Sequence, residues 1–262
     1  MSGGFNSYGD EGRIPQRIDL LVGALKVTKA DFVTLIDTFR WNDIFSDEQL
    51  KKLFGYEYIF RIILEDDYLQ KKGWDNGMVV MTHIADVEFE KISLGSRYAI
   101  KSVVPIEGKK IDIFSTYLND KDEDIRLEQL NKLFTHINKN NPSVLTGDFN
   151  SIDQGDWSKY GSEILHMFAR FPSLKSMEKA LFQMERGEVT ALIKQQGFVD
   201  ADDIKRRRTI PSRLFPVNTV KPLLRLDYAF YNNLVRLREF KVLTGALFDY
   251  TSDHYPITFE LE

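Results

Sequence analysis

The chain of 262 residues contains no cysteine, which excludes disulfide bonds and metal sites built on thiolates. It also lacks any apolar run approaching the ~20 residues that a membrane-spanning helix requires. Its first residues, MSGGFNSY, have neither the basic stretch nor the apolar stretch of a signal peptide. We therefore expect a protein without a membrane span, and we place it in the cytoplasm.

Internal repeats, low-complexity tracts and linkers rich in glycine, serine or proline are missing as well. One domain covering residues 1–262 is the simplest organisation, and we expect a monomer. The net charge of −4 argues against a protein that coats nucleic acid non-specifically. It does not exclude a local basic patch, because backbone phosphates interact with nearby lysine and arginine.

Apolar runs and alternating patterns predict a chain dominated by strands, with helices between groups of them. The predicted strands are 31–36, 56–64, 77–81, 87–92, 98–104, 110–118, 143–146, 226–231, 235–243 and 257–261. The predicted helices are 13–26, 124–137 and two or three short ones in a mainly helical insertion near 156–196, with breaks at Pro172 and Gly187. This order favours an α+β protein in which two β-sheets pack face to face with helices outside. A doubly wound parallel sheet is the alternative, but the middle of the chain lacks the crossover helices that it needs.

Two polar clusters follow predicted strands. The first is Gly147-Asp-Phe-Asn150, in which Asp148 and Asn150 would face the same side of an extended segment. An anion and an amide projecting from a strand end suit phosphate chemistry. The alternative is a turn in which both side chains bond local backbone.

The second cluster is Ser252-Asp-His254, and Asp227 lies inside the apolar segment 224–230. Burial of a carboxylate is costly unless it is paired, and His254 is a natural partner for Asp227. The imidazole could then accept a proton or stabilise charge on a phosphate. Pairing of Asp227 with Arg225 is the alternative.

These segments, in this order, resemble the endonuclease/exonuclease/phosphatase superfamily, which includes pancreatic deoxyribonuclease, abasic-site endonucleases, sphingomyelinases and inositol-polyphosphate phosphatases. The motifs that carry the resemblance are Gly147-Asp-Phe-Asn150, Thr209-Ile-Pro-Ser212, Arg225-Leu-Asp-Tyr228, Ser252-Asp-His254 and, near the start, Phe5-Asn-Ser-Tyr-Gly9. The resemblance covers essentially the whole chain. It implies a four-layered α/β sandwich and metal-dependent hydrolysis of phosphoesters.

The resemblance also implies a role for each motif residue. Asn6, Asp37 and Asp253 would lie at a Mg²⁺ ion, for which Mn²⁺ could substitute. Asp148 would orient or deprotonate the attacking water, and Asn150 would bond a phosphate oxygen. His254, oriented by Asp227, would contact the scissile phosphate.

Two positions depart from the family pattern. The second strand of the family ends in Gln-Glu, whereas this chain offers Asp37, which is one methylene shorter and must sit closer to the ion or reach it through water. Tyr117 stands where many members carry histidine. The abasic-site endonuclease branch also has tyrosine there, and a phenol can donate a hydrogen bond to phosphate.

One dense basic stretch could hold the substrate. Arg206, Arg207 and Arg208, followed by Arg213, precede the catalytic segments and could bind a phosphate-rich backbone. The alternative is a solvated loop that balances Asp200, Asp202 and Asp203.

We therefore expect a Mg²⁺-dependent phosphodiesterase or nuclease acting on nucleic acid through in-line attack of an activated water. One alternative is a phosphatase or phosphodiesterase for a small molecule or lipid headgroup. Another is a binding protein that keeps the fold with impaired turnover.

Overall fold

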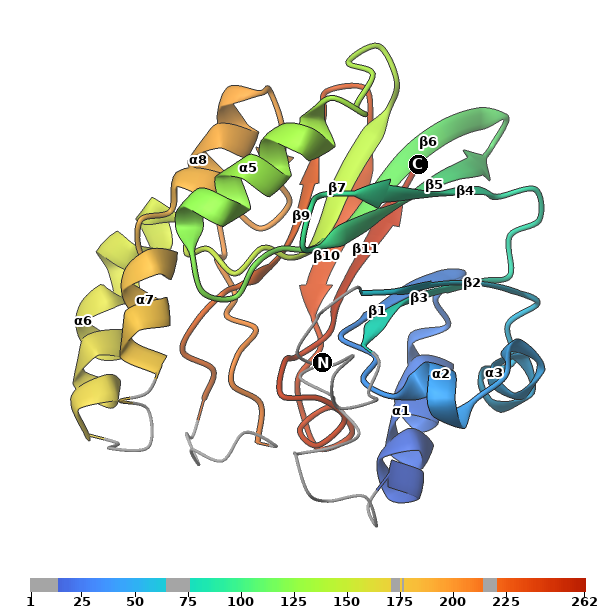
Figure 1. Cartoon of the computed structure of the whole chain (residues 1–262), viewed down its shortest axis with the longest axis horizontal. Helices are drawn as coiled ribbons and strands as arrows, with labels where there is room; N and C mark the ends of the chain where they lie inside the picture. The colour runs from blue at the N-terminus through green and yellow to red at the C-terminus, as the bar shows by residue number, and fades with distance from the viewer. Residues whose placement is uncertain (1–13, 65–75, 171–174, 176, 214–220) are drawn as a thin grey trace.

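The computed structural model describes residues 14–64, 76–170, 175, 177–213 and 221–262 (Figure 1). Its strands are β1 (Phe32–Ile36), β2 (Tyr58–Ile63), β3 (Gly77–Thr82), β4 (Glu88–Ser93), β5 (Tyr98–Ile106), β6 (Lys109–Tyr117), β7 (Ser143–Asp148), β8 (Val199–Asp200), β9 (Asp227–Tyr231), β10 (Leu237–Val242) and β11 (Ile257–Leu261). Its helices are α1 (Ile14–Thr28), α2 (Trp41–Ile44), α3 (Asp47–Phe54), α5 (Glu123–Phe134), α6 (Gln154–Arg170), α7 (Glu178–Met184) and α8 (Glu188–Gln195).

The described strands form three hydrogen-bonded sheets. A six-stranded sheet has the order β4-β5-β6-β7-β9-β8, a three-stranded sheet has the order β1-β3-β2, and β10 pairs with β11. Among the described pairs, β6 with β7 is parallel and the others are antiparallel. This topology excludes the doubly wound parallel sheet, in which parallel neighbours predominate.

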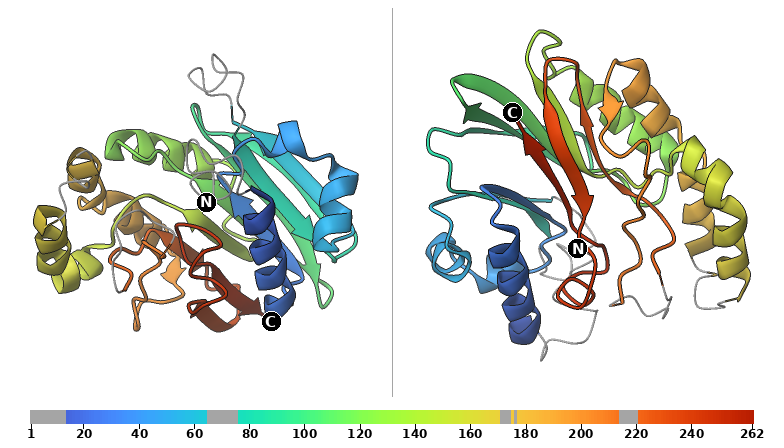
Figure 2. Two further views of the ribbon diagram at one scale, coloured as in Figure 1. Left: turned by 90° about the horizontal axis from the view of Figure 1, so that it is seen from below. Right: turned by 180° about the vertical axis from the view of Figure 1, so that it is seen from behind.

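The sheets and helices form four layers. Met78 and Val80 of β3 pack against Tyr98 and Ile100 of β5, so the three-stranded and six-stranded sheets share an apolar interface. Beyond the six-stranded sheet lie α5 and α8, and α1 and α3 cover the far face of the three-stranded sheet (Figures 1 and 2). Phe259 and Leu261 of β11 pack in the cluster that holds Ile111 and Ile113 of β6 and Val144 of β7, and β10 pairs with β11 at its edge. The predicted four-layered α+β sandwich is confirmed.

Alternation along β6 determines which side chains reach the space between the sheets. Ile111 and Ile113 point into the inter-sheet core, whereas Phe114 points outward against the helices. The hydroxyl of Ser115 meets that of Thr34 from the opposing sheet at 2.8 Å. Tyr117 ends the strand and belongs to the inner face. The polar residues at the strand ends are thereby directed between the two sheets.

The described helices of the 156–196 region are α6, α7 and α8, with Gly187 capping α8 at a φ of 63°. The predicted break at Pro172 lies outside the described residues. Two helices, α2 and α3, were not predicted, although Ser46 and Gln49 form a capping box at the start of α3. None of the helices in the described ranges combines the length and apolarity needed to span a bilayer.

Candidate active site

Three polar side chains lie in one row across the end of the six-stranded sheet. In the registers of β6, β7 and β9, Tyr117 is opposite Asp148, and Asp148 is opposite Asp227. These residues come from segments up to 110 positions apart in the chain, yet strand pairing fixes them as direct neighbours. The predicted clustering of Asp148 and Asp227 therefore follows from the sheet itself.

The imidazole of His254 joins this row through Asp227. Its Nδ1 lies 2.8 Å from Oδ2 of Asp227, and both side chains are largely buried. Arg225, the alternative partner of Asp227, instead forms ion pairs with Asp156 and Asp200. The predicted pairing of Asp227 with His254 is present.

Electrostatics in this pair keeps His254 charged. Burial alone would lower the pKa of His254, but the charge and hydrogen bond of Asp227, with smaller contributions from Asp253 and Asp148, raise it to about 9. In the partner, burial favours a higher pKa, but the charge and hydrogen bond of His254, together with a hydrogen bond from Thr209, outweigh it, so the pKa of Asp227 is lowered. At neutral pH the pair is therefore an imidazolium held by a carboxylate.

The pKa of Asp148 is shifted in the opposite direction from that of Asp227. Burial, reinforced by the charge of Asp227, raises its pKa to about 7, against the opposing effects of His254 and the backbone N–H of Asn150. That N–H donates to Oδ1 of Asp148 at 2.9 Å. A carboxyl group with a pKa near 7 can accept and release a proton at physiological pH.

Asn150 and Tyr117 flank Asp148. The amide Nδ2 of Asn150 donates to the carbonyl of Leu118 at 3.1 Å, and the backbone of Asn150 has a φ of 49°. Burial, followed by the charges of Asp37 and Asp148, raises the pKa of Tyr117 well above its usual range. The phenol therefore stays protonated and is a hydrogen-bond donor at this edge of the sheet.

Asp37 follows β1 and reaches the site from the opposing sheet. Its backbone has a φ of 60°, and its Oδ1 accepts a hydrogen bond from Nδ2 of Asn76. Oδ1 of Asn76 in turn accepts from the N–H of Gly77 at 2.7 Å. Asn76 was not predicted as a site residue. The two residues meet because Asp37 follows β1 and Asn76 precedes β3, and these strands pair in the three-stranded sheet. This pairing joins residues 39 positions apart in the chain, so no local pattern in the sequence reveals it.

Asp253 lies beside His254 and is 8% exposed. The hydroxyl of Ser252 donates to its Oδ1 at 3.3 Å, and its backbone carbonyl accepts from the N–H of Ser212. The third predicted metal ligand, Asn6, lies outside the described residues.

The carboxylates of the site fit a hard divalent cation. In the described part of the chain, neither Asp148 nor Asp253 forms an ion pair with lysine or arginine, although both are buried. The charges of Asp37 and Asp148 both act on Tyr117, and those of Asp148 and Asp253 both act on His254, so all three carboxylates influence the row of Tyr117, Asp148 and Asp227 with its bound His254. Such a concentration of buried negative charge is stabilised by a cation with oxygen ligands.

The potential ligand atoms that lie closest together belong to a different set from the predicted metal ligands. Within the described residues, one ligand atom each from Asp148, Asp227 and His254 fall within 4.8 Å of one another. The family resemblance assigns these three to catalysis, and the assignment of the metal to Asp37 and Asp253 stays a prediction.

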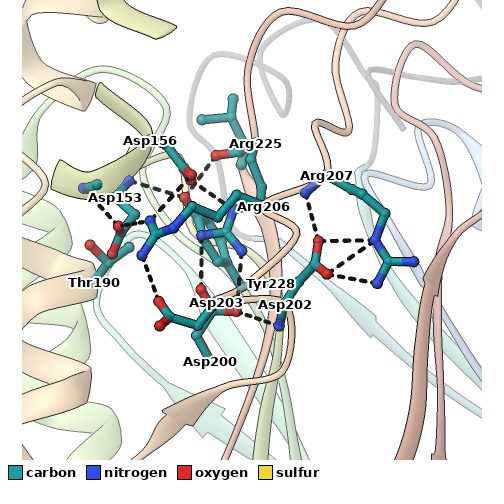
Figure 3. A network of polar contacts seen from close by, with 12 residues as sticks. Asp153, Asp156, Thr190, Asp200, Asp202, Asp203, Arg206, Arg207, Arg225 and Tyr228 are labelled. Carbon is teal, nitrogen blue, oxygen red and sulfur yellow. Dashed lines mark hydrogen bonds and ion pairs between the residues drawn. The ribbon is translucent and has the colours of Figure 1, made fainter. Parts of the chain in front are cut away.

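The arginines of the predicted basic patch form ion pairs with carboxylates of the chain itself, as Figure 3 shows for Arg206 and Arg207. The partners are Asp153, Asp156 and Asp203 for Arg206, Asp202 for Arg207, Glu163 for Arg208 and Asp249 for Arg213. Only the last of these arginines has a mostly exposed side chain, at 57%. The contacts match the alternative of a loop that balances its own acidic residues, and substrate binding by these arginines stays a prediction.

Two further residues at the site gave no signal in the sequence. The guanidinium group of Arg97 lies over the ring of Tyr117, 4.5 Å from its centre, and pairs with Asp120 at 3.0 Å. Arg97 stands in the turn before β5, and Asp120 follows β6. Isolated charged residues in turns are common, so only the three-dimensional structure reveals their place beside a catalytic candidate.

Comparison with known proteins gives a family and a fold. Residues 3–254 match the profile of the Endonuclease/Exonuclease/phosphatase family. A search of curated proteins found no match.

Several solved structures share the fold at low identity. An AP endonuclease from Archaeoglobus fulgidus is similar with a TM-score of 0.63 and 17% identity, over 95% of this chain and 95% of that one. The mannosyl-6-phosphatase from Bacteroides thetaiotaomicron gives 0.64 and 16%, over 98% and 95% of the two chains. A humanized TDP2 from D. rerio gives 0.62 and 16%, over 100% and 96%.

Proposed function

The chain belongs to the endonuclease/exonuclease/phosphatase family, and from this premise we propose that it hydrolyses phosphoester bonds with the help of Mg²⁺, by in-line attack of a water molecule. The observation that carries the proposal is the row of Tyr117, Asp148 and Asp227, with His254 bound to Asp227 at 2.8 Å. It combines a proton acceptor poised near pH 7 with a cationic donor.

Each residue in the row has a distinct task. Asp148 takes a proton from the attacking water, because its pKa of about 7 allows it to be ionised before the step and protonated after it. His254, which is protonated and fixed by Asp227, donates a hydrogen bond to a phosphate oxygen and stabilises the charge that develops there. Tyr117 supplies a second neutral donor.

Asn150 orients this machinery. Its backbone N–H fixes one oxygen of Asp148, which leaves the other oxygen for water. Its amide already donates once to Leu118 and retains a second N–H for a phosphate oxygen.

Asp37 and Asp253, with Asn6 from the start of the chain, would hold the ion. A bound Mg²⁺ polarises the phosphoryl group and offsets its negative charge. Asn76 fixes the Asp37 carboxylate through a direct hydrogen bond.

For the substrate, we propose a phosphodiester of nucleic acid, in line with the name of the AP endonuclease from Archaeoglobus fulgidus. A small phosphorylated molecule is the second candidate, and one observation favours it. Arg206, Arg207 and Arg208 are neutralised by carboxylates of the chain and do not form a free basic track. The mannosyl-6-phosphatase from Bacteroides thetaiotaomicron carries the name of an enzyme of this second kind.

The test compares three substrates with Mg²⁺ and with chelator: bis(p-nitrophenyl) phosphate, an oligonucleotide with an abasic site, and mannose 6-phosphate. Asp148→Asn is the test variant, and Asp124→Asn on the exposed side of α5 is the control. We expect metal-dependent turnover that is lost in the first variant and kept in the second. Turnover that resists chelator, or that survives in Asp148→Asn, would refute the proposal. Cleavage of the oligonucleotide or of the sugar phosphate decides between the two substrates.

A further inference from the structure

The guanidinium group of Arg97 has a hydrogen-bond donor that is not satisfied by the described residues. The Nε and Nη2 atoms of an arginine point their N–H bonds to the same side and match two oxygens of a carboxylate or phosphate. In Arg97, Nη2 donates to Oδ1 of Asp120 at 3.0 Å, whereas Nε is buried and has no hydrogen-bond partner among the described residues. A buried N–H without a partner is costly, and an anion that took both N–H groups would remove that cost.

The position of Arg97 is fixed by the protein. Its carbonyl accepts from the N–H of Leu94 in the turn between β4 and β5, and its guanidinium group lies on the face of Tyr117. Its side chain is 12% exposed. Tyr117 is the neighbour of Asp148 in the sheet, so Arg97 stands directly beside the catalytic row.

The carboxylate of Asp120 is more open than the arginine that it pairs with. Its side chain is 42% exposed, and an ion pair with so exposed a partner contributes little to stability. The loop before Asp120 is anchored, since Asn119 accepts from Arg126 through its carbonyl and donates to Gln129 through its N–H. Asp120 can therefore rotate away at small cost while the loop and Arg97 stay in place.

We propose that Arg97 binds a second phosphate of the substrate, one sugar away from the phosphate that is cleaved, and that Asp120 is an internal competitor which this phosphate displaces. The choice of phosphate as the ligand rests on the proposed function. A phosphate fits because it carries more charge than a carboxylate and can accept from Nε and Nη2 together. Asp120 then makes binding at Arg97 selective for strongly charged groups, because a weakly charged group does not displace its carboxylate.

Arg97 should raise the affinity for the second phosphate and Asp120 should lower it, so substitutions at the two positions should change binding in opposite directions. Titration calorimetry would measure the binding of thymidine 3′,5′-bisphosphate and of thymidine 5′-monophosphate to the full chain with Mg²⁺. The quantity of interest is the ratio of the two dissociation constants, which isolates the second phosphate. In the unmodified protein we expect the bisphosphate to bind about tenfold more tightly.

Arg97→Gln should bring this ratio close to one, and Asp120→Asn should increase it about threefold. Arg97→Lys keeps the charge without the paired N–H groups and should retain only part of the preference. If Arg97→Gln does not fold, the measurement on Arg97→Lys tests the proposal instead. Arg238→Gln on the exposed strand β10 is the matched control for a lost arginine.

A ratio that is one in the unmodified protein, or that is unchanged by Arg97→Gln or by Asp120→Asn, would overturn the inference. Hydrolysis of bis(p-nitrophenyl) phosphate by the same preparations separates it from the proposed function. If no phosphoester is hydrolysed and the ratios still change as expected, the second-phosphate site stands and the hydrolase proposal fails. If hydrolysis is present and the ratios do not change, the reverse holds.

Discussion

Replacement of Asp227 by asparagine removes the charge that keeps His254 protonated. Burial lowers the pKa of His254, but the charge and hydrogen bond of Asp227, with smaller contributions from Asp253 and Asp148, together outweigh it and raise the pKa to about 9. Without that charge the pKa falls toward the ordinary value of 6.5. The asparagine keeps the size of the side chain, so the change is chiefly electrostatic.

The magnitude follows from the two pKa values. At pH 8 the protonated fraction of His254 falls from roughly 0.9 to roughly 0.03, a loss of about 30-fold. At pH 6 the imidazole is mostly protonated in both proteins, and the loss from this cause is less than about twofold. The unmodified enzyme should be most active near pH 8, because Asp148 must lose its proton near pH 7 and His254 must keep its proton up to about pH 9.

The assay has two parts, the pH dependence of kcat/KM on bis(p-nitrophenyl) phosphate and an NMR titration of the His254 imidazole in both proteins. We expect the ratio of the two activities to reach at least about 30 at pH 8 and to shrink as the pH falls. A ratio that does not depend on pH, or an imidazole pKa that stays near 9 in Asp227→Asn, would show that Asp227 does not control the charge of His254. Asp124→Asn again serves as the control for an unrelated lost carboxylate.

Three further results are expected. Asp148→Asn should raise the free energy of unfolding of the metal-free protein, measured with chelator at pH 8, by up to about 4 kcal/mol. The pKa of the buried Asp148 is raised, so above pH 7 its negative charge destabilises the folded state, and asparagine removes that charge. The gain should vanish near pH 4 in denaturant titrations, since the group is then neutral in the folded state. Arg225→Met should cost about 3–5 kcal/mol in the same measurement, because it leaves Asp200 buried without its cation and Asp156 with Arg206 alone; an unchanged midpoint would contradict this. Tyr117→Phe should lower kcat by about tenfold or more with a small change in KM if the phenol acts in the transition state, and an equal kcat would count against it.

The sequence predicted the strands that bury regular apolar patterns. The runs that became β1, β3, β6 and β7 were all expected, because a strand buried between layers needs a continuous or alternating set of apolar side chains. The two-residue strand β8 is too short to leave a pattern. Trp41–Ile44 was missed because a four-residue helix contains little more than one turn of periodicity.

The site residues, like the strands and helices, include some that a local sequence pattern predicts and others that it does not. Asp148, Asp227 and His254 were predicted because each stands in a recognisable motif, and the contact of Asp227 with His254 followed from the cost of burying a lone carboxylate. For Arg206 and Arg207 the sequence left the choice between a phosphate and the nearby Asp202 and Asp203 open, because that choice depends on tertiary positions. The contacts of Arg206 with Asp153 and Asp156 gave no local signal. The contacts of Asn76 with Asp37 and of Arg97 with Tyr117 join separate turns and strands, and no local pattern encodes them.

The metal site proposed at Asp37 and Asp253 is tested by a titration of the apo protein with Mn²⁺, followed by electron paramagnetic resonance at pH 8. We expect one tightly held ion per chain, with affinity that falls about tenfold or more in Asp37→Asn and in Asp253→Asn while both variants keep their circular dichroism spectrum. Unchanged affinity in both variants, or no bound ion in the unmodified protein, would contradict the proposed site.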